Sequence, residues 1–253
     1  KRIAILLYGI ACYAIGMGSL FYMIGWLGNL LVPKSIDSAL TGPFGQSLTI
    51  NLALFAAFGL QHSVMARPSF KKWWTRFVPE AAERSTYILL SGVILTVTML
   101  CWQPMGIVVW ESTNPLLSGL CNAAYAMGWA VLVGSTFALN HFDLFGLRQV
   151  WLQFRKRPYT SPQFATPGPY RMVRHPIYVG WITLVWATPS MSLAHLVFAI
   201  ATTVYIFVAI RFEERDLVAF HGAAYEQYRR RIPMLVPGLL NRQVNPTEQP
   251  AAI

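Results

Sequence analysis

The sequence has 253 residues, of which 55% are hydrophobic and only 12% are charged, whereas about 25% are charged in an ordinary soluble domain. Five long runs contain no charged residue, which excludes a soluble globular protein and predicts an all-α, polytopic integral membrane protein. The formal net charge is +10, but the basic residues flank the apolar runs, so nucleic-acid binding is not predicted.

The first two predicted spans cover roughly residues 3–32 and 47–66. The first span is too long for the apolar core of a signal peptide, and no clear small-residue cleavage site follows it, so we expect it to remain as a helix. Residues 67–84 come next and are basic, with Trp73 and Trp74 among them. This composition is typical of a segment at the level of the lipid headgroups.

The third and fourth predicted spans cover roughly residues 85–103, which Pro104 ends, and 116–139. From residue 140 to 170 the chain becomes polar, basic and aromatic, and it contains four prolines. Proline-spaced sequence of this kind predicts a loop and not a further span. The chain therefore changes character after the fourth span.

A last apolar block, residues 177–210, is long for a single crossing and is divided near its middle by Pro189. Both flanks are basic and so belong on the same side of the membrane, which predicts a helical hairpin of about 12 and 18 residues. The sequence thus predicts about five membrane segments, with the hairpin as the last. We expect two regions, a four-span transmembrane region (1–139) and a cytoplasm-facing region with the hairpin (140–253).

The positive charges are distributed unequally between the two ends of the predicted spans. Of the 20 Lys and Arg residues, all except Lys34 lie before the first span, between the second and third, or after the fourth and the last. Basic residues favour the cytoplasmic side of a membrane. We therefore expect both termini and the two basic loops to face the cytoplasm, and the membrane to be a bacterial inner membrane.

The three cysteines do not indicate a metal site. Cys12, Cys101 and Cys121 lie in or beside apolar runs and lack the paired spacing of metal ligands. No pair of histidines has such a spacing either. We therefore expect buried, unreactive thiols and no bound metal.

Two arginines and a histidine lie between Tyr170 and Tyr178, where the chain re-enters the apolar block. Basic and aromatic residues at this level are common membrane anchors, which is the simpler interpretation. However, Pro176 is well placed to begin a helix, so Arg174 and His175 would lie at the positive end of the helix dipole. This arrangement suits an anionic group such as a carboxylate, which a guanidinium binds with its planar fork.

Acidic residues follow the second half of the hairpin, at Glu213 and Glu214. They either pair with nearby arginines or hold the ammonium group of a ligand. Because the two ends of a hairpin meet in space, the basic and acidic residues together predict an amino-acid-like ligand. Further along, Tyr225 and Tyr228 share one helix face, which is also typical of an amphipathic helix at the membrane surface.

Taken in order, these motifs resemble the integral membrane methyltransferases of the isoprenylcysteine carboxyl methyltransferase type. The pattern is Arg-His-Pro-x-Tyr-x-Gly at 174–180, an apolar hairpin, Glu-Glu-x-x-Leu at 213–217, Tyr-x-x-Tyr at 225–228, and then Pro233. The resemblance implies a catalytic role for region 140–253, with S-adenosylmethionine as methyl donor between the hairpin and the C-terminal tail. The predicted cofactor-binding residues are Tyr170, Arg174, His175, Tyr178, Gly180, Glu213, Glu214, Tyr225 and Tyr228.

The N-terminal half narrows the resemblance. Residues 58–67, the Trp73–Trp74 pair, residues 83–87 and residues 140–150 are similar to the methanethiol S-methyltransferase subgroup. A denitrification-associated membrane family shares some of these traits. The subgroup resemblance implies a small thiol as methyl acceptor, with methanethiol converted to dimethyl sulfide.

Three residues near the cytoplasmic side are candidates for a base that deprotonates the thiol, since the thiolate is the nucleophile. These are His141 and Asp143, just after the fourth span, and His62 near the end of the second. A carboxylate would orient an imidazole, although two residues that are two apart on a helix point in different directions. Alternatively, no base is needed, and Arg174 stabilises the thiolate electrostatically.

Other functions remain open from the sequence. Within the enzymes, the acceptor could be an isoprenylcysteine carboxylate or a lipid amine. A haem or redox subunit would need facing histidines, and only His62 and His195 lie in apolar segments; His195 and His221 are expected to be structural. A transporter is disfavoured because the spans are nearly free of charge.

Overall fold

The computed structural model describes residues 1–39 and 43–238, and within them the chain is mostly helical and has very little strand. The helices are α1 (Arg2–Gly28), α2 (Phe44–Ala66), α3 (Pro68–Trp74), α4 (Glu80–Cys101), α5 (Pro115–Leu139), α6 (His141–Leu144), α7 (Leu147–Phe154), α8 (Pro176–Trp186), α9 (Leu193–His221) and α10 (Ala223–Arg231). A 3-10 turn covers Gly168–Arg171, and two short strands are β1 (Val108–Glu111) and β2 (Ser190–Ser192). The predicted all-α class is confirmed. The end of the predicted C-terminal region, 239–253, lies outside the described residues.

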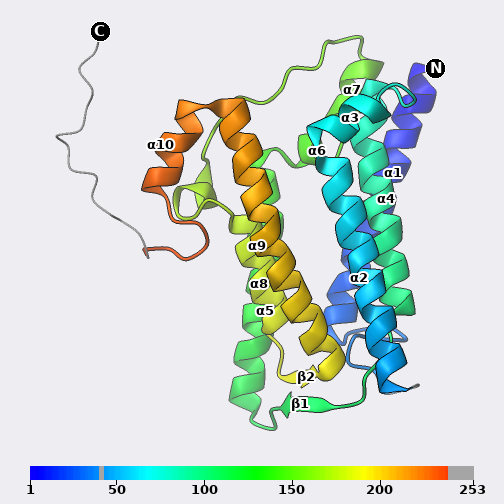
Figure 1. Cartoon of the computed structure of the whole chain (residues 1–253), viewed down its shortest axis with the longest axis vertical. Helices are drawn as coiled ribbons and strands as arrows, with labels where there is room; N and C mark the ends of the chain where they lie inside the picture. The colour runs from blue at the N-terminus through cyan, green and yellow to red at the C-terminus, as the bar shows by residue number, and fades with distance from the viewer. Residues whose placement is uncertain (40–42, 239–253) are drawn as a thin grey trace, which may run out of the picture.

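Five helices are long and apolar enough to cross a membrane, namely α1, α2, α4, α5 and α9. The predicted hairpin is present, as α8, β2 and α9 (Figure 1). Its second helix is longer than predicted, because the chain stays helical through the charged residues after position 210, as far as His221. Glu, Arg and Leu are good helix formers, so the helix ends only at Gly222, which has a φ of +57°.

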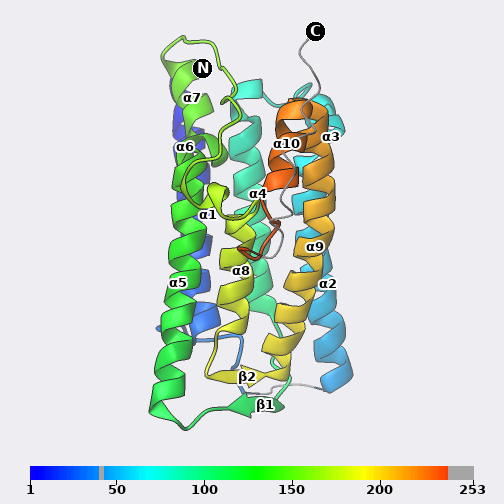
Figure 2. The ribbon, with the colours of Figure 1, turned by 90° about the vertical axis from the view of Figure 1, so that its left-hand side faces the viewer.

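The segments that carry most of the basic residues lie at one end of the bundle, and the paired strands lie at the other (Figures 1 and 2). The strands are antiparallel, with Val108 opposite Ser192. The polar segment 140–170 does not cross the bundle, in agreement with the prediction. It is not a simple loop, however, because it contains α6 and α7, and α7 packs against α1 and α4.

The helices of the bundle form two groups, with α5, α8 and α9 on one side and α1, α2 and α4 on the other (Figure 1). The aromatic rings of Trp26, Trp102 and Phe198 join the groups, with edge-to-face contacts at centroid distances of 5.3–5.9 Å. The most extensive helix pairing is that of α5 with α8. This pairing crosses the predicted boundary between 1–139 and 140–253, and the two-region division stays a prediction.

The close approach of α5 and α8 depends on two glycines. A Cβ atom at Gly128 would lie 2.9 Å from the backbone nitrogen of Leu184, and one at Gly180 would lie 2.8 Å from the backbone nitrogen of Leu132. Small residues allow such contact between helices in lipid, where no hydrophobic driving force holds helices together. The contact therefore fixes the position of α8 and of the residues at its N-terminus.

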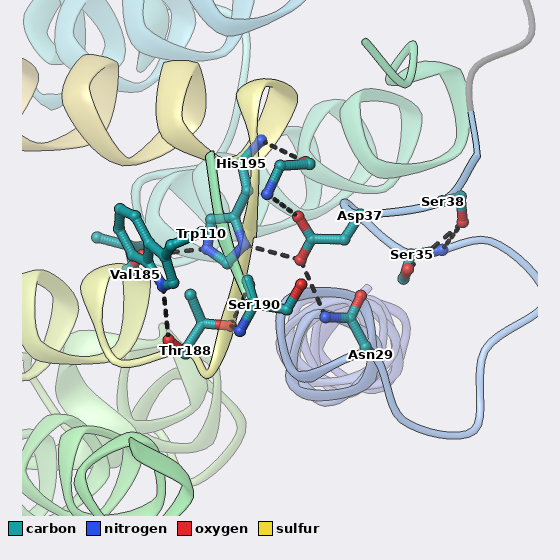
Figure 3. A network of polar contacts seen from close by, with 10 residues as sticks. Asn29, Ser35, Asp37, Ser38, Trp110, Val185, Thr188, Ser190 and His195 are labelled. Atoms are coloured by element: carbon teal, nitrogen blue, oxygen red, sulfur yellow. Dashed lines mark hydrogen bonds and ion pairs between the residues drawn. The ribbon is translucent and has the colours of Figure 1, made fainter. Parts of the chain in front are cut away.

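A buried ion pair ties the loop after α1 to the hairpin, at the end of the bundle that carries the strands (Figure 3). Asp37 Oδ2 lies 2.9 Å from Nδ1 of His195, and Asp37 Oδ1 accepts a hydrogen bond from the backbone N–H of Ser192. The other ring nitrogen of His195 lies 3.0 Å from the carbonyl oxygen of Val185. Both nitrogens thus face oxygens that can accept hydrogen bonds. The partners of His195 agree with its predicted structural role.

We predict that Gly180→Leu destabilises the protein, because the added side chain must push α8 away from α5. Overpacking of this kind costs about 1–3 kcal/mol. Gly134→Leu is the matched control, since a Cβ atom at Gly134 would meet nothing within 4 Å. Thermal unfolding in detergent measures both variants. Equal melting temperatures for the two would contradict the proposed dependence on close helix contact.

We predict that Asp37→Asn lowers the stability of the protein near neutral pH and makes that stability less sensitive to acid. Burial alone would raise the pKa of Asp37, but its bonds to His195, Ser192 and Asn29 and the charge of His195 outweigh burial and lower it. A lowered carboxyl pKa contributes stability above the unfolded-state value of about 4, and this contribution disappears as pH falls through the folded-state value. Breaking such a pair costs about 3–5 kcal/mol.

Thermal unfolding from neutral to acid pH tests this expectation. The difference in stability between wild type and Asp37→Asn should be full at pH 7 and shrink below about pH 4. A constant difference across this range would show that the pair contributes no charge-dependent stability.

Candidate active site

The predicted basic and acidic residues meet at the start of α8. Pro176 is the first residue of α8, and His175 caps the helix. Arg174 Nε donates to Glu214 Oε1 at 2.7 Å, and His175 Nε2 lies 3.1 Å from the same oxygen. These three side chains are only 4–13% exposed. One buried carboxylate is therefore shared by two basic groups.

Glu213 provides a second and more accessible carboxylate, with its side chain 43% exposed. It accepts a hydrogen bond of 2.9 Å from the hydroxyl group of Tyr178, and its Oε2 lies 3.9 Å from Nδ1 of His175. Glu213 and Glu214 thus approach the two different nitrogens of one imidazole. The hairpin brings together the residues that the sequence predicted would meet.

The segment around α10 holds the same cluster from the other side. Nη1 of Arg174 donates to the carbonyl oxygens of Arg229 and Ile232, at 3.0 and 2.6 Å. Tyr228 donates through its hydroxyl to the carbonyl oxygen of Tyr170 at 2.6 Å, and burial raises the pKa of Tyr228 to about 12. Figure 2 shows α10 and the chain after it beside the start of α8. Arg174 therefore connects the hairpin to the C-terminal segment.

A buried hydroxyl group without a partner lies beside this cluster. The Tyr225 side chain is 2% exposed, and its hydroxyl makes no hydrogen bond to the part of the chain that the structure describes. Burial raises the pKa of Tyr225, and the nearby charge of Glu214 contributes to the rise, so the group is a neutral hydrogen-bond donor. An unpaired buried hydroxyl is costly, which makes it a candidate for contact with a bound ligand.

Phe164 lies beside the ring of Tyr225, and sequence reasoning did not identify it. Its ring lies 5.9 Å from that of Tyr225 and 5.6 Å from that of Tyr228, both at steep angles. Together the three rings form an aromatic wall next to the charged cluster. The only signal for Phe164 in the sequence was its place in an aromatic, proline-spaced segment.

Gly180 faces α5 and packs against Gly128. This contact explains the glycine by helix packing alone. Its predicted role in cofactor binding stays a prediction, and any such role would act through the position of α8.

His141 and Asp143 are close in sequence but are not paired in the structure. The ring nitrogens of His141 lie 2.8 Å from the Tyr13 hydroxyl and 2.9 Å from the Thr136 hydroxyl, while Asp143 forms an ion pair with Arg148 at 2.7 Å. Residues two apart on the short α6 point in different directions. Burial lowers the pKa of His141, so its imidazole is neutral. The structure therefore agrees with the argument against their pairing, and the catalytic roles of the two residues stay predictions.

His62 lies on α2, and its side chain contacts α4. Its Nε2 is 2.9 Å from the hydroxyl group of Tyr87, its Nδ1 is 3.3 Å from Ser91 Oγ, and its ring stacks on Phe58 at 5.3 Å. No carboxylate is among these partners. The arrangement favours a neutral imidazole that exchanges hydrogen bonds with hydroxyl groups.

The cavity found in the structure lies apart from the predicted site residues. A largely apolar cavity of about 530 Å³ lies between the start of α1, the turn after α3 and α4, and none of the predicted site residues lines it. Within residues 1–39 and 43–238, no three His, Cys, Asp or Glu side chains are grouped as metal ligands would be.

Comparison with known proteins identifies the class. The isoprenylcysteine carboxyl methyltransferase family profile matches residues 135–219, which include the hairpin and both glutamates. No solved structure matches the chain.

Comparison with curated proteins narrows the assignment within this class of methyltransferases. The chain is 49% identical to the methanethiol S-methyltransferase of Crocosphaera subtropica, over 94% of this chain and 93% of that protein. It is 48% identical to methanethiol S-methyltransferase 2 of Bradyrhizobium diazoefficiens (96% and 93% covered) and 47% identical to the enzyme of the same name from Mycobacterium tuberculosis (94% and 97%). The chain belongs to the methanethiol S-methyltransferase family.

We predict that Arg174→Lys loosens the C-terminal segment without unfolding the bundle. Lysine keeps the charge but cannot reach Glu214 and two carbonyl oxygens with one planar group. Amide hydrogen exchange should rise in residues 223–234 and stay unchanged in α1 and α4. Arg171→Lys is the control, because Arg171 is exposed at the end of its 3-10 turn. Unchanged exchange in Arg174→Lys would contradict the connecting role of this arginine.

Proposed function

We propose that the protein transfers a methyl group from S-adenosylmethionine to methanethiol, giving dimethyl sulfide. The observation that carries this proposal is the cluster of Arg174, His175 and Glu214 at the start of α8, in a chain whose relatives are named for this activity. Dimethyl sulfide follows from the chemistry, since a methyl group replaces the proton of methanethiol.

The described residues fit the donor. Its amino-acid portion carries a carboxylate and an ammonium group, and its sulfur is positively charged. Nη2 of Arg174 makes no hydrogen bond to the described residues and is free to bind the carboxylate. Glu213 and Glu214 offer negative charge for the cationic groups, and the unpartnered hydroxyl group of Tyr225 offers a hydrogen bond.

The aromatic wall suits the adenosine portion. Phe164, Tyr225 and Tyr228 present ring faces and edges beside the charged cluster, and such rings pack well against a purine. We assign Tyr170, which anchors Tyr228 through its carbonyl oxygen, to the support of this wall. When bound, the donor would supply an electrophilic methyl group on a sulfonium.

The protein has to provide two further things, orientation of the acceptor and a route for its proton. A free thiol is mostly protonated at neutral pH, so a base or an electrostatic partner for the thiolate is required. His62, His141 and Asp143 are the candidate bases, and Arg174 is the candidate partner for the thiolate. A neutral imidazole at His62 or His141 is in the protonation state that a base needs.

We propose that the site faces the cytoplasm of a bacterial cell, from its inner membrane. The ends of α2, α5 and α9 and the start of α1 lie together with the basic segments (Figure 1). Positive charge on one side of the spans supports a cytoplasmic orientation for that side. S-adenosylmethionine is a charged, water-soluble donor, so this orientation also places the site where such a donor can reach it.

Donor binding tests the proposal most directly. We predict that detergent-purified wild-type protein binds S-adenosylhomocysteine in calorimetry and that Glu214→Ala and His175→Ala weaken binding at least about tenfold, since each loses a charge-assisted contact. Tyr225→Phe should weaken binding without loss of thermal stability, because the Tyr225 hydroxyl bonds to no partner in the described part of the chain. Tyr8→Phe, which loses a hydrogen bond to Thr86 between α1 and α4, is the control.

Turnover is then measured by gas chromatography of dimethyl sulfide released from methanethiol. Folded wild-type protein that binds no S-adenosylhomocysteine would overturn the donor assignment. Binding together with methylation of an isoprenylcysteine carboxylate or a lipid amine, and not of methanethiol, would overturn the acceptor assignment alone.

A further inference from the structure

A second polar cluster lies inside the bundle, where the two helix groups face each other. It contains the hydroxyl groups of Tyr87 on α4, Tyr178 on α8 and Tyr205 on α9. Tyr205 is 3.0 Å from Ser63 Oγ on α2, and Tyr87 is 2.9 Å from His62 Nε2. Four different helices therefore contribute polar groups to one region.

This tyrosine cluster begins where the proposed donor site ends. Tyr178 donates through its hydroxyl to Glu213. Tyr87 and Tyr205 contact adjacent residues of α2, namely His62 and Ser63. Tyr178 is thus the member of the cluster that contacts the charged residues, while α2 holds the other two.

Contacts between α2 and α9 define one boundary of the region. A Cβ atom at Gly59 would lie 3.3 Å from the ring of Tyr205, so the small residue makes room for that ring. Two turns along α2, Arg67 pairs with Asp216 at 2.9 Å and holds the same helices together. Tyr87 is buried, whereas Tyr178 and Tyr205 are only half-buried within the bundle. The region is therefore bounded by α2 and α9 and lined by hydroxyl groups.

The presence of several hydroxyl groups in membrane-spanning helices calls for a physical explanation. Interhelical hydrogen bonds are one reason, and they contribute modestly to helix association in lipid. The pairs Tyr205–Ser63 and Tyr87–His62 would fulfil that role by themselves. Helix association does not explain the third tyrosine, Tyr178, which contacts Glu213. Three phenol groups from α4, α8 and α9, one of them bonded to Glu213, instead suit a small, polarizable ligand, because sulfur packs favourably against aromatic rings.

We propose that the tyrosine cluster, Tyr87, Tyr178 and Tyr205, binds the sulfur of the methyl acceptor and orients it toward the donor site. The inference rests on the proposed function and deepens it by naming the acceptor side. Hydroxyl groups stabilise a thiolate more than a thiol, because a hydrogen bond to a charged acceptor is the stronger one. Ser63 and His62 act as positioning residues that hold Tyr205 and Tyr87.

A labelling experiment tests the location without turnover. Ser63→Cys places a thiol where the Ser63 hydroxyl lies, 3.0 Å from the Tyr205 hydroxyl in the wild type. The labelling reagent is methyl methanethiosulfonate, which carries a CH3S group of the size of methanethiol. The introduced thiolate attacks the CH3S sulfur, forms a mixed disulfide and releases methanesulfinate. We expect dimethyl sulfide to slow this modification, measured by mass spectrometry, and to leave modification of the exposed Cys101 unchanged.

Kinetics supply the second arm. Tyr87→Phe and Tyr205→Phe should each lower kcat/KM for methanethiol by about fivefold to tenfold, the effect of one hydrogen bond. Their affinity for S-adenosylhomocysteine should stay within about twofold of wild type, because neither side chain contacts the charged cluster directly. Tyr8→Phe is again the control and should keep the wild-type kcat/KM.

The outcomes separate this inference from the proposed function. Wild-type protein without donor binding or methanethiol turnover means that the proposed function has failed. Normal wild-type turnover, combined with no protection by dimethyl sulfide and wild-type kcat/KM in both tyrosine variants, overturns the tyrosine cluster alone. Protection at position 63 together with reduced kcat/KM supports it.

Discussion

The contact between α5 and α8 is the constraint on which the site depends. With glycine at 128 and 180, the two backbones lie too close for a Cβ atom between them. That contact holds α8 at a fixed depth, although α8 has only 11 residues. The start of α8 then places His175 against Glu214 and Tyr178 against Glu213. Helix packing in lipid, which relies on close fit and not on exclusion of water, thus determines where the charges meet.

The charges in turn organise the C-terminal segment. Arg174 is the only side chain in the cluster that bonds both Glu214 and the carbonyl oxygens of Arg229 and Ile232, as far as the described residues go. A buried ion pair adds little net stability unless its remaining hydrogen bonds are satisfied, and these carbonyl oxygens satisfy Nη1 of the guanidinium. The same guanidinium that is proposed to bind a donor carboxylate therefore also closes the fold around it.

Much of this arrangement could be predicted from the sequence. Uncharged runs identified the spans, because charge is costly in lipid, and the position of Pro189 identified the hairpin whose ends had to meet. The alternative in which Asp143 orients His141 was a local inference that the structure does not support, since the ring of His141 contacts Thr136 and also Tyr13, more than 100 residues away. Phe164, Tyr87 and Tyr205 could not be found for the same reason. Their neighbours come from other helices, and no local pattern records a contact between distant segments.

The short length of α8 determines how far polar parts of the chain reach into the membrane. At 1.5 Å per residue, its 11 residues extend about 16 Å, roughly half the thickness of the hydrocarbon layer. Above its start, the volume that a full-length helix would fill is occupied by the polar 3-10 turn and the chain around α10. Polar groups of the chain therefore reach down to the level of His175, within the thickness of the bilayer. The proposed charged donor and its lipid-soluble acceptor would then meet at this boundary without either one crossing the bilayer.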